Sequence, residues 1–239
     1  MENIVGFYCF SYNNPVRKNY ISSQFSTLNI PLKFVDIVEI TDNRISEIFK
    51  DGITYPQNAK RAFCVMFNHL DMIKAFRDSN FEYGICCEDD IILRKSLKDD
   101  LPWFTLAMKS LSLDVLLLGH LFAFELTTTF PFTKGSYSVH DFTDDVWGAH
   151  CYMITKSYAT YILDNYGIEY ARQTLSNSGL TPYTSDWIIT KKGKRALVYP
   201  PAVVEEGSVA TDHSGQISFH YNCSKIHYKP GLFFDRPNK

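Results

Sequence analysis

The sequence predicts an α/β fold in which a sheet carries helices on both faces. The chain opens as strand, helix, strand, because Ile4–Phe10 and Leu32–Ile40 are apolar and Arg17–Leu28 has apolar residues at helical spacing. A helix that crosses between two strands makes them parallel. A further apolar run, Tyr83–Cys87, has the length of a buried strand and ends at three carboxylates, residues 88–90. Ligands of such folds bind at the carboxyl ends of strands, so these acids mark the expected site.

The remaining elements are predicted from periodicity and turn residues. Thr41–Asn58 is irregular, whereas Ala59–Arg77 has a broad apolar helical face. Then come, in order, a helix at Asp99–Ser110, a strand at Leu113–Leu118, a hairpin or mobile loop at Leu121–Thr143, a β-like segment at Trp147–Thr155, a helix at Lys156–Tyr166, a loop at Asn177–Tyr183, an element that starts at Ser185 and a strand at Ala196–Tyr199. The tail is polar and irregular from about residue 203. No linker interrupts the chain, so we expect residues 1–239 to form one domain.

Composition argues against several classes of protein. The formal net charge of −2 does not fit a general nucleic-acid binder. No apolar run reaches the roughly 20 residues that span a membrane, and Met1–Phe10 lacks the basic segment of a secretory signal. The six cysteines form no CxxC pair, so we expect buried thiols rather than disulfides or zinc ligands. These features predict a cytoplasmic protein without a membrane span.

The acidic triplet Glu88, Asp89 and Asp90 lies between the apolar runs Tyr83–Cys87 and Ile91–Leu93. Three carboxylates there are costly to bury as a bare cluster, because like charges repel and lose their hydration. A divalent cation would resolve this, and hard oxygen ligands suit Mn²⁺ or Mg²⁺. If the backbone stays extended, Glu88 and Asp90 share one face while Asp89 points away. The alternative is a solvated acidic turn that caps the next segment.

Five stretches of the sequence occur in an order that is typical of one family. They are Arg61–Leu70 (RAFCVMFNHL), Cys87–Ile91 (CEDDI), Asp114–Gly119 (DVLLLG), Gly148–Thr155 (GAHCYMIT) and Ser185–Trp187 (SDW). Together they resemble glycosyltransferase family 25, which includes lipopolysaccharide-type glycosyltransferases, collagen galactosyltransferases and related proteins of large DNA viruses. The likeness runs from about Ile4 to about Ser218, nearly the whole chain.

The resemblance implies a GT-A fold, with a Rossmann-like mixed sheet, and a transferase that inverts the anomeric carbon. It also implies a UDP- or GDP-sugar donor, a glycan or glycoprotein acceptor, and Mn²⁺ or Mg²⁺ as cofactor. For a viral member, the cytoplasm would be that of the host. The acidic triplet matches the family's metal motif, so the resemblance makes Glu88 and Asp90 metal ligands and places Glu88 and Asp89 against the donor.

Glycosyl transfer also needs a base that takes the proton from the acceptor hydroxyl. Asp186 is our candidate, because its aromatic and apolar neighbours are typical surroundings of a general base. The alternative is a helix N-cap formed by Ser185 or Asp186. Asp144 and Asp145 are rival bases. His69 lies on a mainly apolar helix face, where a satisfied core histidine is the favoured interpretation.

Further candidates lie near the expected donor site. The loop that begins at Phe10 and Ser11 commonly contacts the nucleotide in the resembled family. Asp36, at the end of the second strand, is placed to meet a ribose or base, and Arg61 could neutralise a diphosphate. His213 lies in a polar late loop, and other GT-A enzymes use a late histidine as a further metal ligand.

Two other functions fit parts of this pattern. A nucleotidyltransferase also joins an α/β sheet, paired acids and a nucleotide, although the loop at residues 10–15 lacks the glycines of a phosphate-binding loop. A catalytically degenerate carbohydrate-binding module is the non-enzymatic alternative. The altered first loop and Asn68, where the family usually has serine, are the features that favour it.

Overall fold

The computed structural model describes residues 4–12, 14–50, 55, 57–121, 129–135, 137–206 and 214–237. Its helices are α1 (Pro15–Thr27), α2 (Asn43–Ile48), α3 (Gln57–Arg77), α4 (Leu97–Ser110), α5 (Lys156–Asn165), α6 (Ile168–Ser176), the π-helix η1 (Asp186–Thr190) and α7 (Ser214–His227). Its strands are β1 (Val5–Cys9), β2 (Lys33–Phe34), β3 (Tyr83–Cys87), β4 (Ile91–Leu93), β5 (Val115–Leu117), β6 (Thr129–Lys134), β7 (Tyr137–His140), β8 (Cys151–Thr155), β9 (Arg195–Tyr199) and β10 (Val203–Glu205).

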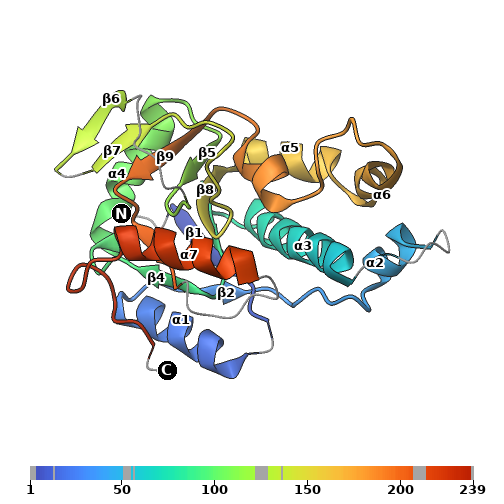
Figure 1. Cartoon of the computed structure of the whole chain (residues 1–239). Coiled ribbons are helices and arrows are strands. Elements are labelled where there is room, and N and C mark those ends of the chain that lie inside the picture. The colour runs from blue at the N-terminus through green and yellow to red at the C-terminus, as the bar shows by residue number, and fades with distance from the viewer. Residues whose placement is uncertain are drawn as a thin grey trace.

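A mixed sheet lies at the centre of the molecule (Figure 1), and its strand order is β2-β1-β3-β8-β5-β9-β7-β6. β1 runs parallel to both β2 and β3, as the strand-helix-strand pattern predicts. β5 is parallel to β9, but β8 is antiparallel to both of its neighbours, β3 and β5. β4 and β10 form a separate antiparallel pair. The acidic triplet therefore lies between the large sheet, at the end of β3, and the small one.

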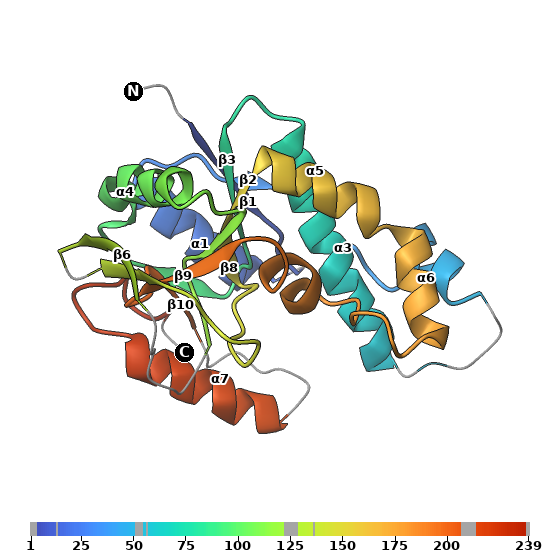
Figure 2. The ribbon, with the colours of Figure 1, turned by 90° about the horizontal axis from the view of Figure 1, so that it is seen from above.

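The sheet separates two apolar cores, because successive side chains of a strand point to opposite faces. On β1, Phe7 and Cys9 join the core that contains the buried residues of α1 and α4, while Tyr8 joins the core of α3 and α5. On β3, Ile85 and Cys86 divide between the two cores in the same way. Figure 2 shows α1 and α4 on one side of the sheet and α3, α5 and α6 on the other. The predicted α/β fold with helices on both faces is confirmed.

The first helix starts close to the carboxyl end of β1. The side-chain oxygen of Asn14 accepts hydrogen bonds from the backbone N–H groups of Val16 and Arg17, at 3.1 and 3.2 Å. Pro15 occupies the first turn, where a missing N–H costs nothing. This cap fixes Arg17 in the first turn of α1, beside the loop that follows β1.

The prediction of a strand over Leu32–Ile40 was wrong in length, since only Lys33–Phe34 are in a strand. Beyond them, the N–H of Val38 donates to the buried side-chain oxygen of Asn68 at 2.7 Å. A side chain from α3 thus takes the place of a neighbouring strand. The expectation of irregular structure over residues 41–58 also missed α2, whose N-cap is Asp42.

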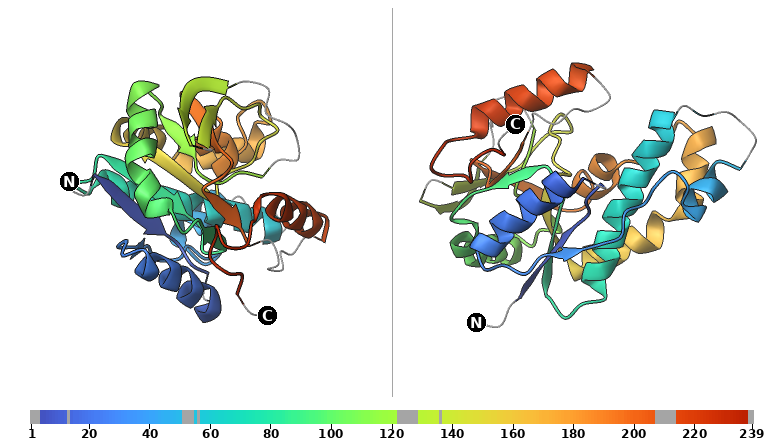
Figure 3. Two further views of the ribbon diagram at one scale, coloured as in Figure 1. Left: turned by 90° about the vertical axis from the view of Figure 1, so that its left-hand side faces the viewer. Right: turned by 90° about the horizontal axis from the view of Figure 1, so that it is seen from below.

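The prediction of an irregular tail from about residue 203 was wrong as well. β10 pairs with β4, and Figure 3 shows α7 lying beside this small sheet. Cys223 and Phe233 are 1% and 0% exposed, and the Arg94 guanidinium lies 5.3 Å from the Phe233 ring. A few well-spaced apolar residues therefore anchor a polar tail, which local periodicity does not reveal. That residues 1–239 form one domain stays a prediction.

Three other predictions can be compared with the structure. The segment Leu121–Thr143 contains the antiparallel hairpin of β6 and β7, although residues 122–128 are outside the described part. All six cysteines are buried and carry thiols rather than disulfides, as expected. None of the described helices is both long enough and apolar enough to cross a membrane.

Candidate active site

The acidic triplet follows β3 directly, but the backbone does not stay extended through it. β3 ends at Cys87, and Asp89 and Asp90 form a bend before β4 begins at Ile91. The expectation that Asp89 points away from a shared face of Glu88 and Asp90 was therefore wrong. Asp89 and Asp90 contact the same arginine, whereas Glu88 contacts a histidine of α3.

Asp89 is the most enclosed of the three, with a side chain that is 1% exposed. Its Oδ2 accepts a hydrogen bond from the Ser11 hydroxyl at 2.6 Å, and its Oδ1 lies 2.6 Å from Nη2 of Arg17. Burial raises the pKa of Asp89, against the lowering effects of Ser11 and Arg17. These contacts tie the triplet to the loop after β1 and to the first turn of α1.

Glu88 is held from the opposite side by His69, which is fully buried in α3. Nε2 of His69 lies 3.2 Å from Glu88 Oε1, and Nδ1 lies 3.2 Å from the Tyr152 hydroxyl. With the proton on Nε2, the ring donates to Glu88 and accepts from Tyr152. Burial favours the neutral acid, but the His69 hydrogen bond and nearby positive charge outweigh it and lower the pKa of Glu88. The favoured interpretation of His69 as a satisfied core histidine is correct for its surroundings, and it also orients a site carboxylate.

Asp90 is less well satisfied than Asp89. Its Oδ2 lies 2.7 Å from Nη2 of Arg17, but Oδ1 is buried and has no hydrogen-bond partner among the described residues. Burial and the neighbouring Glu205 carboxylate raise the pKa of Asp90 well above its usual range, against the lowering effect of Arg17. The backbone fixes this neighbourhood, since the N–H of Glu206 donates to the carbonyl of Asp90 at 2.6 Å.

Glu205 brings the small sheet and α7 to the same place. Glu205 is 8% exposed, and its Oε1 lies 2.8 Å from Nδ1 of His220 on α7. The hydrogen bond to Glu205 raises the pKa of His220. Oε2 of Glu205 is a second buried carboxylate oxygen without a hydrogen-bond partner in the described part of the chain. The Ser224 hydroxyl, also on α7, donates to the Glu205 carbonyl at 2.6 Å and fixes the helix to the strand.

Asp186 begins the π-helix η1 and faces a turn near β8 rather than its own helix. Its Oδ1 accepts hydrogen bonds from the backbone N–H groups of Gly148 and Ala149, at 2.9 and 3.2 Å. Ser185 makes no side-chain capping bond, so the N-cap alternative was wrong. A Cβ on Gly148 would lie 2.7 Å from Leu117 Cδ1, so glycine permits this turn to pack on β5. Both hydrogen bonds from Gly148 and Ala149 use the same carboxylate oxygen of Asp186. The π-helix that Asp186 begins is also of interest, because π-helical turns are frequent at functional sites.

The rival bases Asp144 and Asp145 lie at the surface. Oδ1 of Asp144 pairs with Nη1 of Arg195 at 2.8 Å, and its backbone carbonyl accepts a hydrogen bond from Lys191. Lys191 Nζ also lies 3.7 Å from the ring centroid of Trp147. Burial lowers the pKa of Lys191, against the raising effects of Asp186 and Asp144.

The expected donor-site residues fall into two groups. Phe10 is 1% exposed and meets His69 edge to face, with ring centroids 5.3 Å apart, and Ser11 binds Asp89. Both therefore lie at the triplet. Asp36 and Arg61 are exposed, on the segment after β2 and in the first turns of α3, and the contacts described above for the triplet do not include them. His213 lies outside the described residues.

Sequence reasoning missed Arg17, Glu205 and His220. Arg17 gave a weak signal, as a basic residue in the first turn of the helix that follows the first strand. Glu205 and His220 lie in the tail, where no periodic pattern revealed a strand and helix. Only the pairing of β10 with β4 brings them to the acids.

The donor set fits a hard divalent cation. Within the described residues no three histidine, cysteine, aspartate or glutamate side chains already form a metal site. However, Asp90 Oδ1 and Glu205 Oε2 are buried oxygens without hydrogen-bond partners in that part of the chain, and Mn²⁺ and Mg²⁺ need few protein ligands when water and phosphate complete the shell. Glu88 and Asp90 could hold such an ion.

The chain can be compared with curated proteins and with solved structures. A search of curated proteins finds no match. Among solved structures, the chain is similar to a mannose-1-phosphate geranyltransferase from Thermus thermophilus, with 10% identity, a TM-score of 0.43 and coverage of 82% of this chain and 73% of that chain. It is also similar to a glycosyltransferase involved in the glycosylation of the major capsid of PBCV-1, with 6% identity, a TM-score of 0.33 and coverage of 67% and 65%.

The family comparison covers most of the sheet and the whole acidic triplet. Residues 7–174 match glycosyltransferase family 25, described as LPS biosynthesis protein, which is more than half of the chain. The matched region contains the last three residues of β1 and all of α3, β3 and β8, the elements that position Ser11, His69 and the three acids. The protein therefore belongs to glycosyltransferase family 25 and is a glycosyltransferase.

Proposed function

We propose that this glycosyltransferase moves a sugar from a UDP- or GDP-sugar to a hydroxyl group of a glycan or glycoprotein, with inversion and with the help of Mn²⁺ or Mg²⁺. Asp90 supports this proposal most strongly. It is a buried carboxylate beside two other acids, and one of its oxygens has no hydrogen-bond partner in the described part of the chain. A buried carboxylate oxygen without a hydrogen-bond partner is costly, and a cation that binds there would offset that cost.

Glu88 and Asp90 would hold the ion, and Glu205 is a neighbouring carboxylate whose charge raises the pKa of Asp90. When bound, the ion supplies Lewis-acid stabilisation of the departing diphosphate. Asp89 has a different role in this scheme, because Ser11 and Arg17 already use both of its oxygens. It locks the loop after β1 against the triplet, so that the donor meets a preorganised surface.

Asp186 would act as the general base. The acceptor oxygen attacks the anomeric carbon, the bond from that carbon to the diphosphate oxygen breaks, and the hydroxyl proton passes to Asp186. A single displacement of this kind inverts the anomeric carbon. The N–H groups of Gly148 and Ala149 hold Oδ1 of Asp186, which fixes the carboxylate without engaging Oδ2 in that contact. A general base must lie within hydrogen-bond reach of the acceptor hydroxyl, and Oδ2 is the oxygen that would make this contact.

The proposal can be tested with a panel of UDP- and GDP-sugars and purified protein, with Mn²⁺ or with a chelator. A ligand that binds only the folded protein raises its melting temperature. We expect one donor to raise it with Mn²⁺ but not with chelator, and the Asp90→Asn variant to lose this difference. Asp99→Asn, an exposed acid on α4, is the control. Product from that donor should have the opposite anomeric configuration by NMR.

Two results would contradict the proposal. The first is stabilisation by a donor that is equal with Mn²⁺ and with chelator, and equal in the Asp90→Asn variant. The second is a product that retains the donor's anomeric configuration, which would require a covalent or front-face route rather than one displacement assisted by Asp186.

A further inference from the structure

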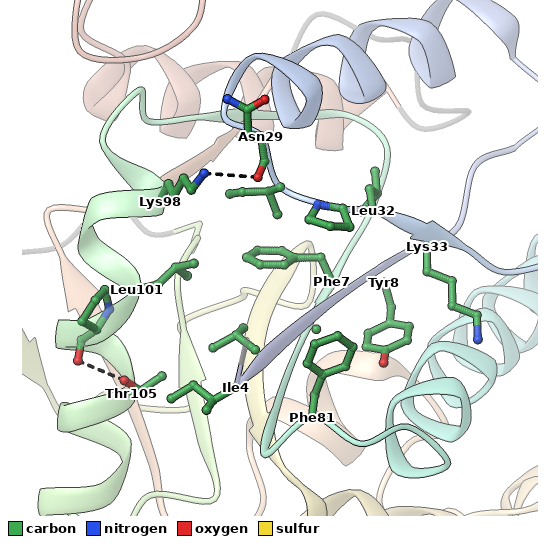
Figure 4. A pocket seen from close by; sticks show the side chains of 15 residues that line it. Ile4, Phe7, Tyr8, Asn29, Leu32, Lys33, Phe81, Lys98, Leu101 and Thr105 are labelled. Carbon is green, nitrogen blue, oxygen red and sulfur yellow. Dashed lines mark hydrogen bonds between the residues drawn. The ribbon is translucent and has the colours of Figure 1, made fainter. Parts of the chain in front are cut away.

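A cavity lies at the opposite end of β1 from the acids. It has a volume of about 670 Å³ and opens between the start of β1, the segment from α1 to β2, and α4. Figure 4 shows Phe7 and Phe81 at this cavity, with Lys98 and Lys33 on opposite sides of it. Its volume and mainly apolar lining are those of a ligand-binding site. Neither the acidic triplet nor Asp186 lines it.

The cavity lies along an open edge of the large sheet. β2 is two residues long and pairs only with Tyr8 and Cys9 of β1. On that side of β1, no described strand pairs with Val5 or Gly6. An edge strand with open backbone groups is a template for pairing with another extended chain.

The backbone directions show which groups are open. The carbonyl of Ile4 accepts from N–H groups of Glu82 and Tyr83, on the β3 side. The carbonyl of Cys9 accepts from Val35, on the β2 side. Because alternate residues of a strand point their N–H and C=O groups to opposite edges, Val5 and Phe7 face the β2 side, as Cys9 does. The N–H of Phe7 and both backbone groups of Val5 therefore point to the cavity edge.

The lining residues come from both faces of the sheet. Phe7 and Ile30 belong to the core of α1 and α4, whereas Tyr8 and Phe81 belong to the opposite core. An added strand would place its side chains alternately on these two faces. The cavity thus offers apolar contacts on each side of a row of open backbone groups, which a compact small molecule would use only in part.

We propose that this edge groove binds an extended segment of a partner protein, which adds as a strand beside β1. The segment has apolar side chains at alternate positions and an acidic residue at one or both ends. The charge follows from the described lining residues, which include the exposed Lys33 and Lys98 and no aspartate or glutamate. Strand addition of this kind obtains affinity from main-chain hydrogen bonds and specificity from side-chain pockets.

A second copy of this chain fits the groove poorly. A symmetric dimer would bring two identical edges together, and two concave edges leave their cavities unfilled. Lys33 and Lys98 would also face the same two lysines of the other copy. A separate polypeptide with acidic ends satisfies both the shape and the charge.

The test uses a display library of short random peptides, selected on the full-length wild-type protein. We expect peptides with alternating apolar residues and acidic ends to be enriched. Val5→Pro removes one open N–H at the first strand position, where proline is tolerated on an edge, and should weaken the best peptide by about tenfold or more. Lys33→Glu with Lys98→Glu should weaken it by about threefold to tenfold. Lys95→Glu with Lys109→Glu, two other exposed lysines, is the control and should bind normally.

Amide hydrogen exchange by NMR gives a readout that does not depend on the folding of any variant. On wild-type protein, the peptide should slow exchange at Val5 and Phe7 and leave Gly6 and Tyr8, which face β3, unchanged. The proposal is overturned if no peptide of this pattern is enriched, or if the peptide binds without protecting Val5 and Phe7. Equal binding by the Val5→Pro and control variants would also overturn it. Peptide binding should survive Asp90→Asn, which separates this site from the catalytic proposal.

Discussion

The two ends of the central sheet contain opposite kinds of side chain. At the carboxyl end of β1 and β3, Asp89 and Asp90 pair with Arg17 and Glu88 contacts His69. The Glu205 carboxylate is close enough to Asp90 to raise its pKa. At the amino end, apolar side chains line a cavity and its lysines stay exposed. The carboxyl end therefore buries charged side chains, whereas the amino end leaves an apolar surface uncovered.

These two kinds of surface indicate two kinds of binding. Buried carboxylates with unsatisfied oxygens oppose folding, so a sequence retains them where they bind a ligand or carry a reaction. An open apolar edge opposes solubility and is retained where another chain covers it. Each end of the sheet should consequently respond to its own substitutions and be insensitive to those at the other end.

The largest expected effect concerns Asp186. We expect Asp186→Asn to reduce turnover by about 10²–10⁴-fold, because the amide cannot accept the proton of the acceptor. The amide oxygen can still accept from Gly148 and Ala149, so the turn and the affinity for donor should be preserved. Calorimetry with donor and a transfer assay measure the two properties separately. Asp144→Asn, which removes only a surface ion pair with Arg195, is the matched control. Wild-type turnover in Asp186→Asn would exclude this residue as the base.

The second effect concerns His69, which orients Glu88 from the core. We expect His69→Asn to raise the Mn²⁺ concentration for half-maximal activity by about 10–100-fold, the usual cost of losing a residue that supports a metal ligand. Tyr152→Phe removes the hydroxyl that bonds Nδ1 of His69 and should cause a smaller shift in the same direction. If His69→Asn lowers the melting temperature but leaves the Mn²⁺ concentration for half-maximal activity unchanged, His69 contributes only to packing.

A smaller effect is the pH dependence of stability that His227, a residue away from the triplet, should cause. Burial, aided by Lys229, lowers the pKa of His227 to about 4. An unperturbed histidine titrates near about 6.5, so between these values the unfolded chain binds more protons. Stability should therefore fall as the pH decreases from about 6.5 to about 4. In chelator-treated protein, the melting temperature of His227→Gln should decrease less across this pH range than that of the wild type. An equal decrease in both proteins would show that His227 does not cause this pH dependence.

The sequence predicted correctly those helices and strands whose pattern of apolar residues lies within one continuous segment. The strand at Tyr83–Cys87, the helix that became α3 and the acidic triplet belong to this class. The direction of Asp89 was not predictable, because the bend at residues 89–90 depends on Ser11 and Arg17. The length of β2 depends likewise on a hydrogen bond from Val38 to a side chain of α3.

The contribution of Glu205 and His220 to the candidate site could not be predicted from the sequence for a related reason. Glu205 and His220 lie in a tail with little periodicity, and they reach the acids only because β10 pairs with β4 and Ser224 fixes α7 to β10. Such contacts join segments that are distant in the chain. Composition alone also could not show that β2 is too short to cover β1, which leaves the edge groove open.

The proposed metal site is tested most directly by measuring Mn²⁺ binding to three versions of the protein. Electron paramagnetic resonance monitors the binding in the presence of UDP or GDP. We expect wild-type protein to bind the ion and Asp90→Asn to weaken binding by at least about tenfold. Lys33→Glu, at the other end of the sheet, should have no effect. Equal Mn²⁺ affinity in wild type and Asp90→Asn, or no binding by wild type with either nucleotide, would contradict the proposed metal site.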